Sequence, residues 1–305
     1  MERQKTVNVY RIHLKTDAKQ RKKLVEYCLF GDTGRLAIGW SYLHEIYPEI
    51  RTAADFSDAY RRKEGSVKRP LETFAKVEKN DLLWTRDLDG NYYICRVVGS
   101  PYAFYDKDLD IGAVVPVDVR KVGINVPGNI VSRFSRSGNS PTIERIRDDS
   151  IIRYSMSIYN ELCGAEIYST PEDAAYDLFD MLPPLDLEEL VIDYLQIRYD
   201  YYLSKNSVAR ADTTIKIECE LFPRTPGSNL PAVLQVKGGD GRVPSDDFQG
   251  YVQDGKHVYL FFSNEQYDAP CEGITYISRA EILKFAHDYY EVLPSAIQRW
   301  IAMCR

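Results

Sequence analysis

Residues 213–222 read TTIKIECELF and residues 232–238 read AVLQVKG, and these two stretches decide the fold of the second half of the chain. Apolar and polar residues alternate in both, which predicts two strands because successive side chains of a strand point to opposite faces. The apolar face of the first strand would consist of Ile215, Ile217, Cys219 and Leu221. If the strands pair, Glu218 converges with Gln235 and Lys237 on the other face, and Asp212 lies at the start of the first strand.

This group of side chains suits a metal-dependent phosphodiesterase. Carboxylate and amide oxygens hold Mg²⁺, and a bound metal polarises a phosphodiester and lowers the pKa of a water molecule. A lysine beside the metal positions or activates that water. A solvated polar strand face is the alternative that the two strands alone leave open.

The segments around these strands alternate between helix and strand. The pattern predicts a helix over residues 185–203, with Asp186 as N-cap and Glu189 as its partner in a capping box. After the two strands come a short helix (246–255), a buried strand (257–262) and two closing helices (281–293 and 296–304). This order predicts an α/β core around a mixed sheet.

The first half of the chain is rich in strand patterns. Strands are predicted at residues 6–15, 35–43, 113–119 and 126–134, and helices at 19–30 and 151–162. Residues 80–99 form two strand-like runs joined across Asp89-Gly90, a dipeptide that favours a tight hairpin turn. Gly and Pro separate the short strands, which predicts a small, curved, barrel-like sheet.

Composition restricts the classes to which the chain can belong. An apolar content of 44% over 305 residues is enough to fill large cores and argues against a disordered chain. No apolar run approaches the roughly 20 residues of a membrane span, and the charged opening residues do not form a secretion signal. Cytoplasmic localisation without a membrane partner is therefore expected. The six cysteines lie far apart, which predicts reduced thiols rather than a zinc site.

Charge is divided unevenly along the chain, whose net charge is -6. Residues 1–150 carry 26 Lys and Arg against 21 Asp and Glu, whereas residues 151–305 carry 13 against 24. A basic first half favours a polyphosphate ligand, and an acidic second half tolerates a divalent metal.

The run from Leu187 to Phe262 resembles the Mrr-type restriction endonucleases of the PD-(D/E)xK nuclease superfamily. That family places a Glu on the first core helix, an acid on one strand and (E/Q)xK on the next. In this chain LEELVIDYL resembles the helix, ADTTIKIE the acid-bearing strand, and Gln235-Val236-Lys237 the (E/Q)xK motif. The resemblance implies that Gln235 and Lys237 are catalytic and that Mg²⁺ or Mn²⁺ is the cofactor, with Gln235 among the metal ligands.

Two acidic positions complete the site that the resemblance implies. On the helix Glu188 is preferred because it aligns with the apolar side, whereas Glu189 belongs to the expected capping box. Members of the family commonly have an Asp-Gly-Gly-Ile-Asp-like run whose second acid binds metal, and that position is Lys216 here. The metal-binding acid is therefore Asp212 or Glu218, with Asp212 preferred. If neither serves, the nuclease is degenerate and only binds.

The first half resembles a PUA-related domain of the EVE type. The resemblance rests on RIHLK, AIGW, DLLWTRD and YYICRVVG, in this order, within about residues 7–145. Such domains resemble readers of modified bases, which hold a flipped base in an aromatic-lined pocket. The resemblance implies base-binding and phosphate-binding roles for Trp40 and Trp84 as pocket walls, Tyr92 and Tyr93 beside them, and Arg86 and Arg96 at phosphates. A core position is the alternative for a Trp on a strand of a small barrel.

Together the two resemblances imply a modification-dependent, type IV-like restriction endonuclease of α+β or α/β class. A small β-barrel domain (1–165) would recognise a modified base, with modified cytosine expected, in double-stranded DNA. A helical linker (166–184) would join it to a nuclease domain (185–305) with a mixed sheet. A two-stranded target and a single catalytic motif predict a homodimer. The alternatives are a non-catalytic reader with a degenerate nuclease fold and an RNA-directed defence nuclease.

Overall fold

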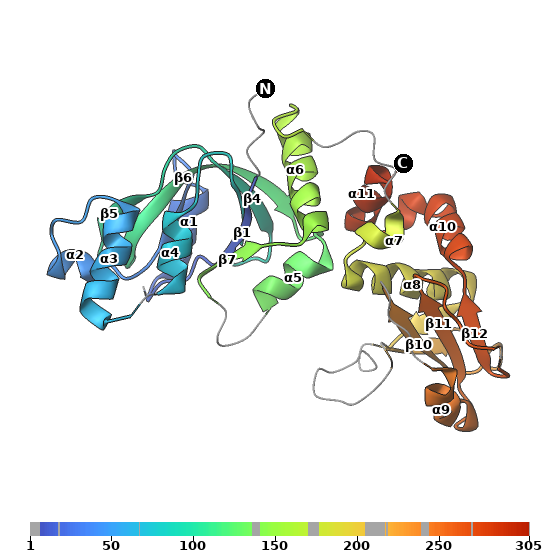
Figure 1. The fold of residues 1–305 in the computed structure, drawn as a ribbon. Coiled ribbons are helices and arrows are strands. Elements are labelled where there is room, and N and C mark those ends of the chain that lie inside the picture. Colours follow the sequence, from blue (N-terminus) through green and yellow to red (C-terminus); the bar gives the residue numbers. More distant parts are fainter. Residues whose placement is uncertain are drawn as a thin grey trace. The chain divides into compact units, whose positions relative to one another are not determined.

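The computed structural model describes residues 7–17, 19–66, 68–135, 141–169, 177–204, 217, 219–238, 244–269 and 271–304. Two compact units divide the chain: residues 1–126 with 130–172 form the first, and residues 127–129 with 173–305 form the second. Each unit holds a mixed sheet of its own (Figure 1). Among the described residues, no helix is long and apolar enough to cross a membrane.

Seven strands form a curled sheet in the first unit, in the order β2-β6-β4-β3-β1-β7 with β5 beside β6. The strands are β1 (Val9–Ile12), β2 (Arg35–Ile38), β3 (Leu82–Arg86), β4 (Tyr92–Val97), β5 (Tyr102–Asp106), β6 (Ile111–Gly123) and β7 (Ile143–Ile146). Strand β1 runs parallel to β3 and antiparallel to β7. The long strand β6 pairs with β2 and β5 through its first half and with β4 through its second half. The sheet therefore curls into a half-barrel, which agrees with the curved sheet predicted from the sequence.

The hairpin between β3 and β4 forms at the predicted turn. Gly90 has a φ of 86°, a conformation that favours glycine. The Asp87 carboxylate accepts hydrogen bonds from the backbone N–H groups of Asp89 and Asn91 and from the Tyr93 hydroxyl. One side chain thus satisfies several donors of the turn.

Helices cover both faces of the curled sheet. They are α1 (Arg21–Leu29), α2 (Tyr42–Ile46), α3 (Ala53–Glu64), α4 (Arg69–Ala75), α5 (Gly128–Ser135) and α6 (Asp149–Cys163). On one face α1, α3 and α4 contribute Leu24, Phe56 and Phe74 to a shared core. On the other face Trp84 of β3 stacks against Tyr154 of α6. The sheet is therefore the middle layer of the unit.

Residues 128–135 are helical, so the strand predicted over residues 126–134 is wrong. Ile130 and Phe134 are four residues apart, and both are buried, with 1% and 3% exposure. This spacing places them on one side of a helix, and a short apolar run does not by itself distinguish a helix from a strand. Packing in the folded chain decides between them.

The second unit is built on five strands in the order β12-β11-β10-β9-β8. Its elements are α7 (Leu178–Met181), α8 (Pro184–Arg198), β8 (Tyr201–Leu203), β9 (Cys219–Pro223), β10 (Ala232–Lys237), η2 (Ser245–Phe248), α9 (Gln249–Gln253), β11 (His257–Phe262), β12 (Ile274–Ile277), α10 (Arg279–Asp288), η3 (Tyr290–Val292) and α11 (Ser295–Met303). Strand β10 is antiparallel to β9 and parallel to β11, and β12 is parallel to β11. The mixed sheet predicted for this half is therefore present.

Helix α8 begins earlier than expected, and the predicted capping box is absent. Pro184 is the first helical residue and Pro183 precedes it as N-cap, because proline at the first position already has the helical φ. Asp186 therefore lies within the first turn. Its carboxylate accepts hydrogen bonds from the Gly128 backbone N–H at 2.6 Å and from Trp300 Nε1 at 2.8 Å. It ties α8 to α11 instead of capping the helix.

The strict alternation expected along residues 213–222 does not extend to Ile217. Cys219 pairs with Leu234 on one face of the sheet. Ile217 instead packs with Val233 and Phe248 in a cluster on the opposite face. The regular strand begins at Cys219, so the period of two holds only from there.

Candidate functional site

Strand β10 brings Gln235 and Lys237 to one face of the second sheet. Its register with β9 places Val233 opposite Glu220, as the predicted strand pairing requires. Alternation puts Val233, Gln235 and Lys237 in line on the face that packs against Phe248. The two strands therefore pair, which is the condition on which the predicted polar face depends.

Gln235 and Lys237 differ in their burial. The Gln235 side chain is 3% exposed, and its Nε2 donates to the Val236 carbonyl at 3.1 Å. This bond orients the amide, whose oxygen is a ligand of the type that Mg²⁺ prefers. Lys237 is half-buried at the last position of the strand, where its carbonyl accepts from the Ser263 N–H at 2.9 Å. The backbone that carries the ammonium group is thus held by its pairing with β11.

The N-terminal end of α8 lies beside the carboxyl end of β10. A Cβ atom placed on Gly238 would lie 3.5 Å from Leu187 Cδ2. Glu188 follows Leu187 directly and is half-buried. The fold therefore brings Glu188 to the same end of the sheet as Lys237, although the two belong to separate elements.

The remaining predicted ligands, Asp212 and Glu218, lie outside the described residues, as does Lys216. Within the described ranges, no group of three or more His, Cys, Asp and Glu is placed to hold a metal ion. The donors present, the Gln235 amide and the Glu188 carboxylate, are oxygen ligands that fit Mg²⁺ rather than zinc. A complete site needs an anionic oxygen from Asp212 or Glu218.

Two further carboxylates on α8, Glu189 and Asp193, have raised pKa values. Burial raises the pKa of Asp193 to about 6, although Gln196 donates a hydrogen bond to it. The Glu189 side chain reaches the solvent. The protein atoms around it nevertheless desolvate its carboxylate, and this desolvation, followed by repulsion from Asp193 and Asp186, raises the pKa of Glu189. Perturbed acids concentrate at functional sites. Glu189 and Asp193 are four residues apart, and this spacing is the feature of the sequence that could have identified them as a pair on one side of the helix. Because the predicted capping box is absent, Glu189 is a further candidate residue of the site.

In the first unit, Trp40 lies in a tightly held loop. It has a φ of 66°, which is rare for a bulky side chain. The next residue, Ser41, donates from its backbone N–H and its hydroxyl to Asp110 Oδ1, at 2.9 and 2.7 Å. Asp110 itself has a φ of 47°. Hydrogen bonds thus hold the residue that follows Trp40 against a second left-handed residue, and strain of this kind concentrates at binding sites.

The Trp40 indole belongs to an aromatic–lysine cluster, which consists of Trp40, Tyr42, Tyr60, Lys63 and Lys68. The three rings are half-buried and both lysines are exposed. Lys68 Nζ lies 5.8 Å from the ring centroids of both Trp40 and Tyr60, and Lys63 Nζ lies 4.1 Å from that of Tyr42. Trp40 and Tyr60 meet edge to face, with centroids 6.5 Å apart. Partly exposed rings beside cations suit a nucleobase and its phosphate.

Trp84 lies in the core of the first unit. Its side chain is 0% exposed, and Nε1 donates to Ser155 Oγ at 2.8 Å. Tyr92 and Tyr93 are also buried, at 5% and 4% exposure. Of the four aromatic residues that the resemblance implies for the pocket, Trp40 alone has a half-exposed ring. For Trp84 the structure agrees with the core alternative.

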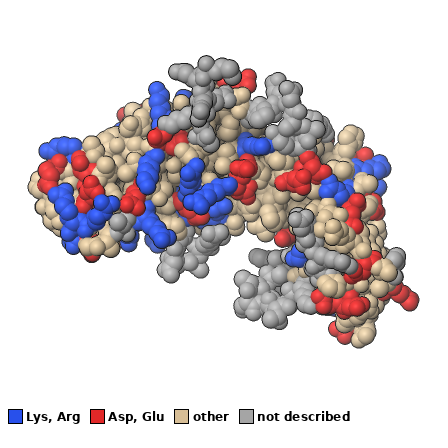
Figure 2. All heavy atoms as spheres, in the orientation of Figure 1, with Lys and Arg blue, Asp and Glu red and all other residues tan. Residues whose placement is uncertain are grey.

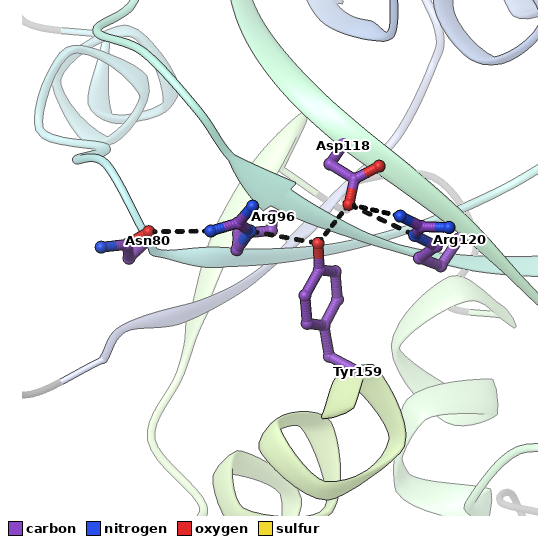
Figure 3. A network of polar contacts seen from close by, with 5 residues as sticks. All are labelled: Asn80, Arg96, Asp118, Arg120 and Tyr159. Carbon is purple, nitrogen blue, oxygen red and sulfur yellow. Dashed lines mark hydrogen bonds and ion pairs between the residues drawn. The ribbon is translucent and has the colours of Figure 1, made fainter. Parts of the chain in front are cut away.

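Arg96 belongs to a polar network that joins α6 to the sheet (Figure 3). Its Nε donates to the Tyr159 hydroxyl at 3.1 Å, and a terminal nitrogen donates to Asn80 Oδ1 at 3.4 Å. Tyr159 in turn donates to Asp118, which also accepts from Arg120. Burial raises the pKa of Tyr159, so the hydroxyl keeps its proton and remains a donor. Arg96 therefore has a structural role in this network.

Arg86 also has partners within the first unit. A terminal nitrogen donates to the Phe134 carbonyl at 3.1 Å, and the guanidinium lies 5.6 Å from the Phe134 ring centroid. His13 packs edge-on against the same ring, with centroids 5.2 Å apart. Burial, followed by repulsion from Arg11, lowers the pKa of His13 to about 4. The imidazole is therefore neutral near pH 7, and the arginines supply the positive charge here.

No family model, no curated protein and no solved structure matches the chain.

Proposed function

We propose that the chain is a modification-dependent DNA endonuclease. The second unit hydrolyses the phosphodiester with Mg²⁺ or Mn²⁺, and the first unit binds the modified base. The observation that carries the proposal is the position of Gln235-Val236-Lys237 on a strand between antiparallel β9 and parallel β11, with the start of α8 at its carboxyl end. The resemblance to Mrr-type nucleases likewise implies an (E/Q)xK motif on the strand that follows a Glu-bearing helix and an acid-bearing strand.

The roles of the residues follow from their chemistry. Gln235 and either Asp212 or Glu218 would hold the metal, which when bound supplies positive charge at the scissile phosphate and lowers the pKa of water. Lys237 would hold the attacking water by a hydrogen bond from its ammonium group. Glu188, at the same end of the sheet, would orient the lysine or a second water. A homodimer would place one such centre on each DNA strand.

Base recognition is proposed for the aromatic–lysine cluster around Trp40. A base that leaves the duplex loses stacking, and it recovers part of that energy on an aromatic face. Trp40 offers a half-exposed face, and Lys68 lies close enough to attract a neighbouring phosphate. Of the buried aromatic residues, Tyr93 belongs to the hydrophobic core against which Trp40 packs, whereas Trp84 and Tyr92 lie outside that core.

The test is cleavage by the full chain of matched plasmids that carry unmodified cytosine, 5-methylcytosine, 5-hydroxymethylcytosine or N6-methyladenine, with RNA in parallel. We expect metal-dependent cutting of modified DNA, and we expect Lys237→Ala to abolish it while fold and DNA affinity are kept. Lys284→Ala is the matched control, because Lys284 is exposed on α10 and pairs with Asp288. A Lys237→Ala protein that cuts normally under saturating metal would exclude the Gln235-Val236-Lys237 motif as the catalytic site.

A non-catalytic reader is the second candidate. Lys216 occupies the position where the resembling family commonly has its metal-binding acid. If neither Asp212 nor Glu218 replaces that acid, the second unit binds DNA without cutting it. Selective binding of modified DNA with no cleavage in Mg²⁺ or Mn²⁺ would establish this function.

A further inference from the structure

A cleft of about 520 Å³ in the first unit lies between α4 and β7 and is rich in arginine. Arg69 comes from α4, Arg133 from α5, Arg145 from β7, and Arg147 from the residues directly after β7. Four arginines from α4, α5 and β7 with the residues after it thus line one cavity. None of them belongs to the aromatic–lysine cluster or to the residues that the sequence assigned to phosphate.

The two acids in the cleft already have partners. Glu144 accepts from Arg133 at 3.0 Å through one carboxylate oxygen and from the buried Arg11 at 2.8 Å through the other. Asp148 is the N-cap of α6, where it accepts from the backbone N–H groups of the first turn. Arg133 and Arg11 therefore neutralise Glu144, and the Asp148 carboxylate, which is bonded to neutral N–H groups, offsets only one of the remaining positive charges.

Three arginines carry the surplus charge. Arg69, Arg145 and Arg147 are exposed, and none forms an ion pair with a residue that the structure describes. Figure 2 shows Lys and Arg gathered over the part of the first unit that holds α3 and α4, whereas Asp and Glu are more evident on the second unit. A guanidinium group binds phosphate in a bidentate manner and stays charged at any physiological pH.

A second cavity in the same unit has a lining of a different character. It has a similar volume of about 510 Å³ and is lined by Ala, Val, Pro, Ser and Thr residues together with Glu78 and Lys79. Its charges balance, and nothing in it favours an anion.

We infer that the arginine cleft binds consecutive phosphates of a nucleic-acid backbone. The inference rests on the proposed function, because it takes DNA as the ligand of the first unit. Arginines spread over α4, α5 and β7 match a chain of repeated charges better than a single anion. A backbone contact carries no base information, so the cleft contributes affinity equally to modified and unmodified DNA.

The experiment measures binding of both duplexes by the full chain, without metal, at salt concentrations from 50 to 200 mM. The variant combines Arg145→Gln with Arg147→Gln, and the control combines Lys76→Gln with Lys79→Gln, two exposed lysines of the same unit. Each phosphate contact contributes about 0.9 to the slope of log K against log salt. Loss of two contacts should lower that slope by about 1.8, so the ratio of parent to variant affinity should shrink by about 12-fold over this range. The control should keep the parental slope.

The salt slopes of the variant and of the control decide whether the arginine cleft binds the nucleic-acid backbone. A variant with the parental slope, or a control with the same loss, overturns the inference. Loss of inorganic tripolyphosphate binding without a change in the DNA slope would show a site for a small polyanion, which also overturns it. A parent that binds no nucleic acid refutes both the inference and the proposed function. A parent that binds DNA without cutting it refutes the nuclease assignment alone, and the slopes still decide on the cleft.

Discussion

Replacing Trp84 and Trp40 by alanine, one at a time, should separate the core of the first unit from its proposed base-binding surface. Trp84 is 0% exposed and bonds Ser155 at 2.8 Å. Removal of a buried Trp side chain costs about 3–5 kcal/mol, and the lost hydrogen bond adds about 1 kcal/mol at most, because Ser155 still donates to the Ile151 carbonyl. We expect Trp84→Ala to lower the free energy of unfolding by about 4 kcal/mol, and thus Tm by roughly 8–16 °C for a unit of this size.

Trp40→Ala should behave in the opposite way. Its ring is half-exposed and lies against Tyr60 at the edge of the core, so we expect a loss of stability below about 1 kcal/mol. A base stacked on an aromatic face contributes about 1–3 kcal/mol, so affinity for modified DNA should fall by roughly 5- to 150-fold. Trp40→Phe keeps an aromatic face and should retain most of the binding.

The assay pairs urea or thermal unfolding of each variant with binding of modified and unmodified duplexes at fixed salt. Unmodified DNA should respond little to Trp40→Ala, because its contacts are chiefly to phosphate. If Trp40→Ala destabilises the unit as much as Trp84→Ala, Trp40 is a core residue and the cluster is not a binding surface. If both variants remain folded and bind modified DNA like the parent, the pocket lies elsewhere.

Two predictions concern the second unit. In the plasmid assay, Asp212→Asn should be inactive and Glu218→Gln active. Neutralising a metal ligand deprives the ion of an anionic oxygen, whereas neutralising a residue that does not bind the metal has no such effect. Equal activity of the two variants would contradict the choice of Asp212 as the metal ligand. Burial raises the pKa of Asp193 to about 6, against about 3.9 in an unfolded chain. The folded protein therefore holds this proton more tightly than the unfolded chain. The stability that the protonated Asp193 contributes is full below about pH 3.9 and is lost as pH rises through about 6. Asp193→Asn should therefore stabilise the protein at pH 7 by about 1 kcal/mol, after allowance for its solvent contact, and by nothing near pH 3.5, as urea unfolding at the two pH values would show. If Asp193→Asn is less stable than the parent at pH 7, the raised pKa of Asp193 is contradicted.

Local patterns with strong preferences were predicted correctly. The Asp89-Gly90 hairpin forms because the turn geometry itself requires those residue types. The helix predicted over 151–162 corresponds to α6, which has Asp148 as N-cap and Gly164 in a left-handed conformation after its last turn. The pairing of β9 with β10 followed from alternation over several residues.

Short apolar segments were predicted less well. Residues 128–135 have the composition of a strand and form a helix, and Ile217 leaves the alternation that holds from Cys219 onward. In both places the preference of the local sequence is small compared with the energy of burying one side chain, so packing decides.

The sequence by itself determined which residue types lie on a shared strand or turn, because those relations depend on periods of two or four residues. It therefore singled out Gln235 and Lys237, and it placed Trp40 among the aromatic candidates. Tertiary structure alone decided the use of each side chain: Asp186 binds Trp300 instead of capping a helix, Trp84 lies in the core, and Arg69 of α4 shares one cleft with the arginines of α5 and β7. Burial and charge neutralisation depend on neighbours from elsewhere in the chain, and their identity is set only when the elements pack together.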